Sequence, residues 1–196
     1  MNPQTKRNAS LAVALLIGFV LACNSVGGGD ETDKANKLVA EANTAIEAGN
    51  KAAIEAGRKN DRIFDEIKSS SFDEDKERLS ATAKEAISGF TQSAERFREA
   101  ARKFEEASKL KINDKFKEYL VLKSQEFNKN AEQVEAAKLM PQAVLDSEDA
   151  ETLSQKVREN KARYDKLEKE AKELADKAEK VRAENKDKFQ GDNSSK

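Results

Sequence analysis

The side chains that could do chemistry in this chain are carboxylates, lysines and hydroxyls, because it has no His and a single Cys. Without His there is no imidazole base, no His-bearing zinc site and no Ser-His-Asp triad. The 36 Lys and Arg and 37 Asp and Glu residues are interspersed, which is typical of solvated helical faces. The sequence holds no Gly-rich phosphate loop, calcium loop or HExxH motif. It therefore predicts a non-catalytic protein without cofactor or metal.

The single Cys, Cys23, has a distinctive context. Lys6 and Arg7 precede an uncharged run, residues 11–22, that ends directly before this Cys. A helix over that run would be about 18 Å long, well short of the roughly 30 Å hydrocarbon core of a bilayer. The run is therefore interpreted as the apolar region of a signal peptide rather than as a membrane span.

The run Val20-Leu21-Ala22-Cys23 resembles the lipobox of bacterial lipoproteins, although Leu21 is bulkier than the usual occupant of its position. In that family the Cys thiol receives diacylglycerol, a peptidase cuts before the Cys, and the new amino group is often acylated. The resemblance implies that residues 1–22 are a signal peptide that is removed and that Cys23 is the lipid attachment site. Two or three acyl chains, at about 0.8 kcal/mol per buried methylene, would hold the mature protein on a membrane. The alternative is an ordinary secretory signal with a coincidental Cys.

The residues after Cys23 predict where the mature protein lies. Residues 23–30 are interpreted as the lipidated Cys and a short Gly-rich tether. The lipoprotein family commonly marks inner-membrane retention with Asp after the Cys, and Asn24 is not Asp. The resemblance therefore implies the cell envelope, with the periplasmic face of the outer membrane favoured over the inner membrane. Without Lys6 and Arg7 the chain has 34 basic and 37 acidic residues, and the two signs are interspersed along it. We therefore predict no nucleic-acid partner and no electrostatic binding to anionic lipid.

Residues 31–189 are predicted to be all-α, an elongated antiparallel helical bundle or coiled coil of three to four long helices, because Ala, Glu, Lys and Leu dominate. The first helix is expected from Thr32 to about Lys68. Its inner face has spacings of three and four and comprises Leu38, Ala42, Ala45, Gly49, Ala52, Ala56, Ile63 and Ile67.

The first helix contains a near duplication, residues 45–51 and 53–59. Its two glycines, Gly49 and Gly57, each cost about 1 kcal/mol relative to Ala in a helix. They predict the close approach of a neighbouring helix, or alternatively a kink or hinge.

A second helix is expected after the Ser69-Ser70-Ser71 break, where Ser71 and Glu74 form a capping box. Its inner face comprises Leu79, Ala83, Ala86, Phe90, Ala94, Phe97, Ala101 and Phe104. The heptad spacing of the three Phe residues predicts core positions, with a ligand slot between helices as the alternative. If the first two helices form a hairpin, contacting residue numbers should sum to about 142, so that Phe97 faces Ala45, Phe90 faces Ala52 and Phe104 faces Leu38.

A break is expected near residues 111–113, capped by Asn113 or Asp114, although one continuous helix of about 100 Å is the alternative. The third helix should run from about Asp114 to Leu139 with Phe116, Leu120, Phe127, Ala131 and Val134 inward. Met140-Pro141 should end it, leaving a linker through Asp146.

The last helix is expected to be capped by Asp146 or Ser147. It has a heptad seam of Ala150, Leu153, Val157, Asn160, Tyr164, Leu167, Ala171, Leu174, Ala178 and Val181. Asn160 is either a buried register-setting residue or a half-exposed seam position. Residues 190–196 are expected to be a polar tail.

Together these features predict a membrane-anchored envelope lipoprotein that contacts another envelope protein or its own copies. One alternative is a module that binds a lipid or other apolar ligand between its helices. A further alternative is an oligomeric membrane-to-wall tether, because the chain ends in Lys196 and the helical murein lipoprotein of enteric bacteria is joined to peptidoglycan through a C-terminal Lys.

Overall fold

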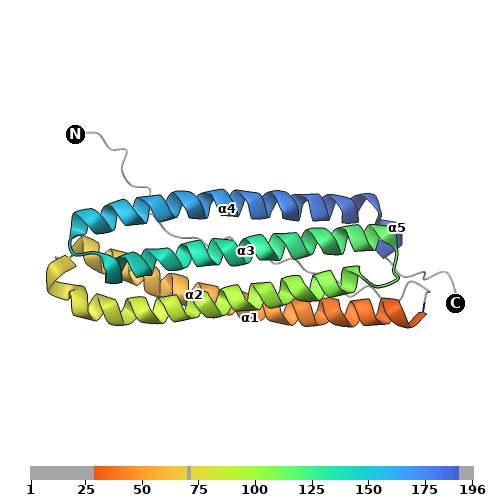
Figure 1. Cartoon of the computed structure of the whole chain (residues 1–196), viewed down its shortest axis with the longest axis horizontal. Coiled ribbons are helices and arrows are strands. Elements are labelled where there is room, and N and C mark those ends of the chain that lie inside the picture. The colour runs from red at the N-terminus through yellow and green to blue at the C-terminus, as the bar shows by residue number, and fades with distance from the viewer. Residues whose placement is uncertain (1–28, 70–71, 190–196) are drawn as a thin grey trace.

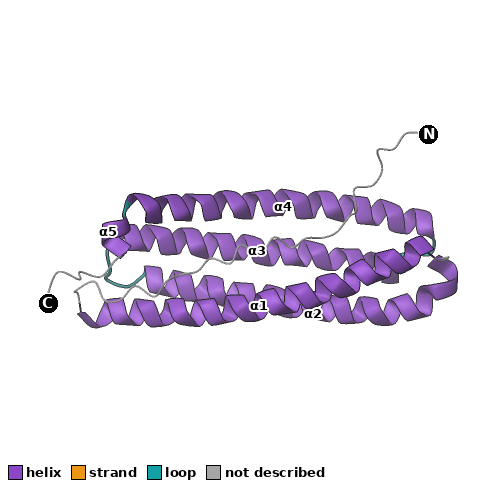
Figure 2. Ribbon diagram, turned by 180° about the vertical axis from the view of Figure 1, so that it is seen from behind, coloured by secondary structure: helices purple, strands orange, loops and turns teal. Residues whose placement is uncertain are grey.

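The computed structural model describes residues 29–69 and 72–189, and every long element in this part of the chain is a helix (Figures 1 and 2). Four long helices, α1 (Gly29–Ser69), α2 (Phe72–Ser108), α3 (Asp114–Asp146) and α4 (Ala150–Glu184), are followed by the short α5 (Lys186–Phe189). Consecutive helices pack side by side, so the fold is the predicted antiparallel all-α bundle. At 1.5 Å per residue, the 41 residues of α1 span roughly 60 Å.

The two ends of the bundle are built from different parts of the chain. The start of α1, the α2–α3 connection and α5 lie at one end, and the α1–α2 turn and the α3–α4 connection lie at the other (Figure 1). The Glu31 carboxylate of α1 accepts a hydrogen bond from the Lys111 backbone N–H in the α2–α3 connection. Phe189 of α5 meets Phe116 and Tyr119 of α3 edge to face, with ring centroids 5.7 and 5.4 Å apart.

The predicted break between the second and third helices is confirmed, and the single continuous helix is excluded. Helix α2 ends at Ser108 and α3 begins at Asp114. The Asn113 side chain accepts a hydrogen bond from the Lys115 N–H at 2.9 Å, because the first backbone donors of a helix have no partner within it. The break after Ser69 is also confirmed, whereas the Ser71–Glu74 capping box lies outside the described side chains.

The predicted end of α3 at Met140-Pro141 is wrong, and so is the predicted linker through Asp146. Pro141 lies inside α3 and removes one intrahelical hydrogen bond, which costs about 3 kcal/mol. The helix continues because Met140, Ala143 and Val144 are 2%, 3% and 0% exposed, and their burial offsets that loss. The predicted caps of the last helix are wrong too: the Asp149 carboxylate accepts the Thr152 N–H at 2.8 Å and caps α4.

The core follows the predicted faces closely. Phe90, Phe97 and Phe104 are 1%, 3% and 0% exposed, which confirms their core role. All five residues predicted to point inward from α3 are buried. On α4 the buried seam residues include Leu153, Tyr164, Leu167, Ala171 and Ala178, whereas Val157, Leu174 and Val181 are half-buried. The predicted seam position of Ala150 is wrong, because this residue is exposed. The core is thus an aliphatic and alanine-rich seam with a few aromatic rings.

The predicted α1–α2 hairpin is confirmed, with contacts displaced from the predicted register. The Phe97 ring lies against Gly49, four residues beyond Ala45, with its Cε1 3.0 Å from where a Gly49 Cβ would stand. Lys59 pairs with Glu85 at 2.8 Å, which is a displacement of two residues. The displacement arises because helical side chains lean toward the N-terminus of their own helix, so that in an antiparallel pair the two leans add.

Candidate functional site

The sequence singles out Cys23 as the site residue, and Cys23 lies outside the residues that the structure describes. The chain between Cys23 and the first residue of α1, Gly29, has five residues. Fully extended, this stretch reaches at most about 20 Å. A group attached at Cys23 therefore cannot lie farther than this from the bundle end that holds the start of α1. No described helix is long and apolar enough to cross a membrane.

The interior of the bundle contains a buried ion pair on α3. The Lys123 Nζ lies 2.7 Å from the Glu126 Oε2, and the two side chains are 4% and 2% exposed. Lys123 also stands over the Phe127 ring, 4.8 Å from its centroid. Burial raises the pKa of Glu126, the neighbouring Lys123 lowers it in part, and Glu179 on α4 raises it further. The pair is therefore held by one hydrogen bond and a cation–π contact in a low-dielectric setting.

The ring beneath this pair belongs to a small aromatic stack between α2 and α3. Phe127 lies 5.9 Å from Phe97 and 5.7 Å from Phe104, measured between ring centroids. Of these three rings, Phe127 is the one that Lys123 contacts. Both charged groups are buried, and both belong to α3.

A second polar contact fixes α3 against α4. The Asn160 side-chain amide donates a hydrogen bond to the Leu139 carbonyl at 2.9 Å, two residues before Pro141. Asn160 is half-buried, which confirms the alternative of a half-exposed seam position, and its hydrogen bond links α4 to α3.

Other polar side chains that are buried among the described residues include Asn60, Ser93 and Tyr164. Asn60 on α1 and Ser93 on α2 are both fully buried, and neither amide atom of Asn60 nor the Ser93 hydroxyl has a hydrogen-bond partner. Burial also raises the pKa of Tyr164 on α4 to about 12. These residues are spread over three helices.

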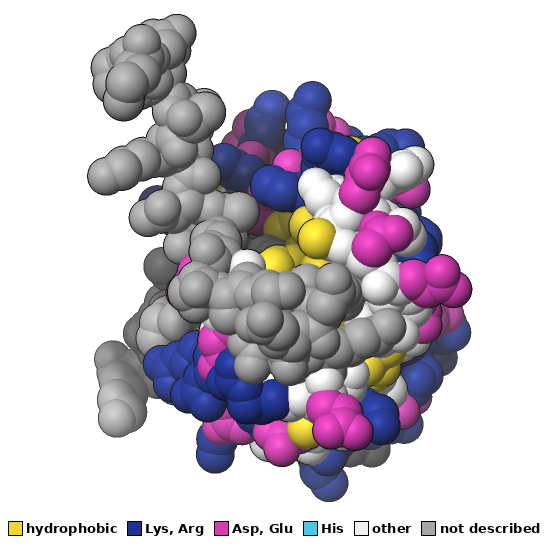
Figure 3. Space-filling model, turned by 90° about the vertical axis from the view of Figure 1, so that its left-hand side faces the viewer, with side chains coloured by type: hydrophobic (Ala, Val, Ile, Leu, Met, Phe, Trp, Pro, Cys, Tyr) yellow, Lys and Arg dark blue, Asp and Glu magenta, His cyan; other side chains and the backbone are white. Residues whose placement is uncertain are grey.

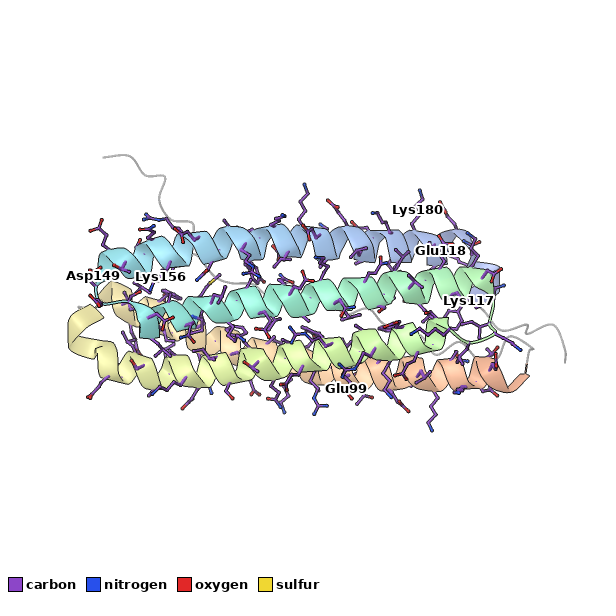
Figure 4. All side chains as sticks on the ribbon, viewed as in Figure 1. Glu99, Lys117, Glu118, Asp149, Lys156 and Lys180 are labelled. Carbon is purple, nitrogen blue, oxygen red and sulfur yellow. The ribbon has the colours of Figure 1, made fainter. Side chains whose placement is uncertain are left out.

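The outer surface is charged on all described helices. Glu99, Lys117, Glu118 and Lys180 lie at outward positions (Figure 4). Ion pairs join neighbouring helices: Lys103 to Glu41 at 2.7 Å, Arg98 to Glu135 at 3.3 Å and Lys129 to Glu170 at 3.3 Å. Exposed pairs of this kind are worth about 0–1 kcal/mol each. On the end face in Figure 3 both signs are mixed and only small apolar areas show.

The hollows on the described surface include one on α2 and one on α1. One, of about 460 Å³, lies along α2 and includes Arg96, Arg98 and Arg102. The other, of about 440 Å³, lies along α1 beside the exposed Ile54. Each is lined by side chains of a single helix, so neither is a cleft between helices. Among the described residues there is no group of three or more carboxylates or other ligands placed to hold a metal ion.

No known family, curated protein or solved structure matches the chain. The described helices carry charged side chains along their outer faces (Figure 4).

Proposed function

We infer that this chain is a lipid-anchored lipoprotein of the bacterial envelope that acts by contact, through the outer faces of a helical bundle. The observation that carries the proposal is the position of the single Cys of the chain: Cys23 follows an apolar run with basic residues before it and occupies the obligatory position of a lipobox-like motif. The outer membrane, at its periplasmic face, is the favoured location, because Asn24 follows the Cys.

The described bundle supports a contact role in two ways. It starts six residues after Cys23, so an anchored bundle would be held near the bilayer by one end. Its helices of 33 to 41 residues would carry the opposite end up to roughly 60 Å away. Interhelical ion pairs and two buried hydrophobic clusters hold the helices together. The exposed charged faces are suited to polar contacts with another envelope protein or a second copy.

The proposal is tested in bacterial cells with the unaltered chain and its Cys23→Ser variant. With radiolabelled palmitate, the unaltered chain should take up label and sediment with the envelope, whereas Cys23→Ser should take up none. Ser25→Cys in the Cys23→Ser background is the matched control, because it restores a thiol two residues away without restoring the motif. Equal labelling of all three chains, or none in the unaltered chain, would contradict the proposal.

The contact role is tested with a photo-crosslinking residue at Glu99 or at Lys180, which lie on the outer faces of α2 and α4 (Figure 4). A partner that binds one face should give a discrete adduct from one position and none from a buried position such as Ala100. An adduct of twice the chain mass would identify self-association. Absence of adducts from every outer position would contradict a contact role.

A further inference from the structure

The two ends of the bundle differ in charge, when each end is taken as the outermost turns of its helices with the connections between them. One end comprises the start of α1, the α2–α3 connection, the end of α4 and α5 (Figure 1). Its residues, 29–32, 105–117 and 181–189, include seven basic and seven acidic side chains, so we call it the neutral end. The other, the acidic end, comprises residues 66–75 and 143–153, with eight acidic residues and one Lys.

The acidic end keeps an excess of negative charge after its nearest cations are counted. Arg78 pairs with the Glu66 carboxylate at 2.9 Å, and the Lys156 Nζ donates a hydrogen bond to the Asp146 backbone carbonyl at 2.7 Å. With these two cations included, the eight acidic residues still face only three basic ones. In the α3–α4 connection, residues 148, 149 and 151 are all exposed and acidic.

The tether of the proposed anchor joins the bundle at the neutral end. Helix α1 begins there at Gly29, and the Lys111 backbone N–H of the α2–α3 connection donates a hydrogen bond to the Glu31 carboxylate. The chain from Cys23 to Gly29 reaches at most about 20 Å. A lipid on Cys23 would therefore keep the neutral end near the bilayer, whereas the tether leaves the acidic end free to approach the surface or to point away from it.

The charge of the lipid surface decides between these two orientations. A membrane leaflet that contains anionic lipids has a negative surface potential, which changes an equilibrium by a factor of about five for each unit charge close to it. The potential falls off over a screening length of about 8 Å at physiological ionic strength. A bundle lying along the surface would bring its acidic end into this layer, whereas an upright bundle would hold that end roughly 60 Å away.

We propose that an anionic bilayer orients the anchored bundle, so that the neutral end stays at the surface and the acidic end is repelled to the far side. This inference rests on the lipid anchor proposed above. The partner is a leaflet of anionic phospholipid, and the interaction is repulsion of the acidic end, which is compatible with the expectation that the chain does not bind such lipid through its charges. The upright bundle presents the outer faces of its helices away from the membrane.

The test uses two exposed alanines at opposite ends of α4, Ala150 at the acidic end and Ala183 at the neutral end, about 50 Å apart along the helix. The full chain with Ala150→Cys or Ala183→Cys is purified with its lipid from bacterial cells. It is reconstituted into vesicles of phosphatidylcholine alone, or of phosphatidylcholine and phosphatidylglycerol in equal parts. Because the anchor would occupy the thiol of Cys23, the introduced Cys carries the donor dye, and the lipid carries the acceptor.

Energy transfer from Ala150→Cys should be lower in the anionic vesicles than in the neutral ones, whereas transfer from Ala183→Cys should stay high in both. Concentrated salt should remove the difference at Ala150→Cys, because it shortens the screening length to about 3 Å. Flotation of the vesicles tests the anchor separately. A chain that floats with neither kind of vesicle would overturn the anchor and this inference together, whereas a chain that floats with both and shows equal transfer from Ala150→Cys would overturn this inference alone.

Charge variants locate the effect at the acidic end. Glu148→Gln with Glu151→Gln removes two exposed charges there and should reduce the preference for the upright orientation by a factor of up to about 25. The matched control is Glu55→Gln with Glu173→Gln, which removes two exposed charges from α1 and α4 away from both ends. An equal rise of transfer from Ala150→Cys in both variants, or none in the first, would overturn the proposal. If a variant fails to fold, the comparison of the two lipid compositions still decides.

Discussion

The two copies of the near duplication in α1 have almost the same sequence and different surroundings. In the first copy, residues 45–51, Ile46 is 6% exposed and Gly49 packs against the Phe97 ring. In the second, residues 53–59, Ile54 is 39% exposed and Gly57 has no atom within 4 Å of a Cβ position. The same residue types thus lie in the core in the first copy, whereas in the second copy the isoleucine is exposed and the glycine has no close neighbour.

The cause is the period of the duplication. Eight residues of an α-helix turn it by two full turns and about 80° more. Each residue of the second copy is therefore rotated by about 80° from its counterpart, which takes Ile54 out of the core and moves Gly57 from the α2 side to the opposite flank. The comparison teaches that a local repeat is conserved in structure only when its period matches the helix.

The largest effect is expected from the contact that distinguishes the first copy. Phe97→Ala should lower the free energy of unfolding by about 3–5 kcal/mol, because the ring fills the space between Gly49 and Phe127. Chemical denaturation, followed by circular dichroism, measures the change. A loss below 1 kcal/mol would show that the ring is not a core element of the first copy.

The two isoleucines form a matched pair for the next largest effect. Ile46→Ala should cost about 2–5 kcal/mol, since it leaves a cavity in the core. Ile54→Ala should stay within about 0.5 kcal/mol, since Ile54 is on the surface. Chemical denaturation of each variant, followed by circular dichroism, measures the change in its free energy of unfolding. Equal losses in the two variants would remove the distinction between the copies.

The two glycines give a smaller and more specific difference. Both Gly49→Ala and Gly57→Ala gain about 1 kcal/mol of helix propensity, so that gain cancels when the two variants are compared. Only Gly49→Ala drives a Cβ to 3.0 Å from the Phe97 Cε1, and such overpacking costs about 1–3 kcal/mol.

Gly57→Ala should therefore be more stable than Gly49→Ala by about 1–3 kcal/mol, with thermal denaturation as the measurement. In a Phe97→Leu background the difference should shrink, because the ring that causes the clash is gone. A difference that persists unchanged there would place the cause elsewhere.

The smallest effect concerns the lysines at the ends of the copies. Lys59 donates a hydrogen bond to Glu85 and holds the pKa of that carboxyl below its usual range. Because the folded pKa is lowered, the pair stabilises the protein above the unfolded pKa of Glu85, and this contribution is lost as the pH falls through the folded value.

Lys59→Gln should therefore raise the pKa of Glu85 toward its ordinary value of 4.5, as read by ¹³C NMR of its carboxyl carbon. The matched control is Lys51→Gln in the first copy, where Lys51 is exposed. The control should leave the pKa of Glu85 unchanged, and an equal shift in both variants would contradict the pairing.

Spacing alone was sufficient to predict the hairpins, the phenylalanine core and the break before Asp114, because these depend on apolar periodicity and local capping. Two inner faces were predicted with a gap of seven residues, from Ala56 to Ile63 and from Leu120 to Phe127. The structure places Asn60 and Lys123 in these gaps, both buried. A polar residue at the position where the next apolar residue of the heptad pattern is expected therefore indicates a buried polar side chain.

Other features could not be read from local pattern. The continuation of α3 through Pro141 depends on burial of the residues that follow it against other helices, which a local rule for Pro does not contain. The buried pairing of Lys123 with Glu126 could not be predicted either, because Lys and Glu three residues apart also form pairs on the surface, as Lys129 and Glu132 do.

The most direct test of the proposed lipid anchor is the intact mass of the protein purified from bacterial membranes. The account predicts a chain that begins at Cys23 and carries the added mass of diacylglycerol, with or without a further acyl group on the new amino terminus. A chain that begins at Met1, or one that is cleaved at another residue and carries no lipid, would contradict it.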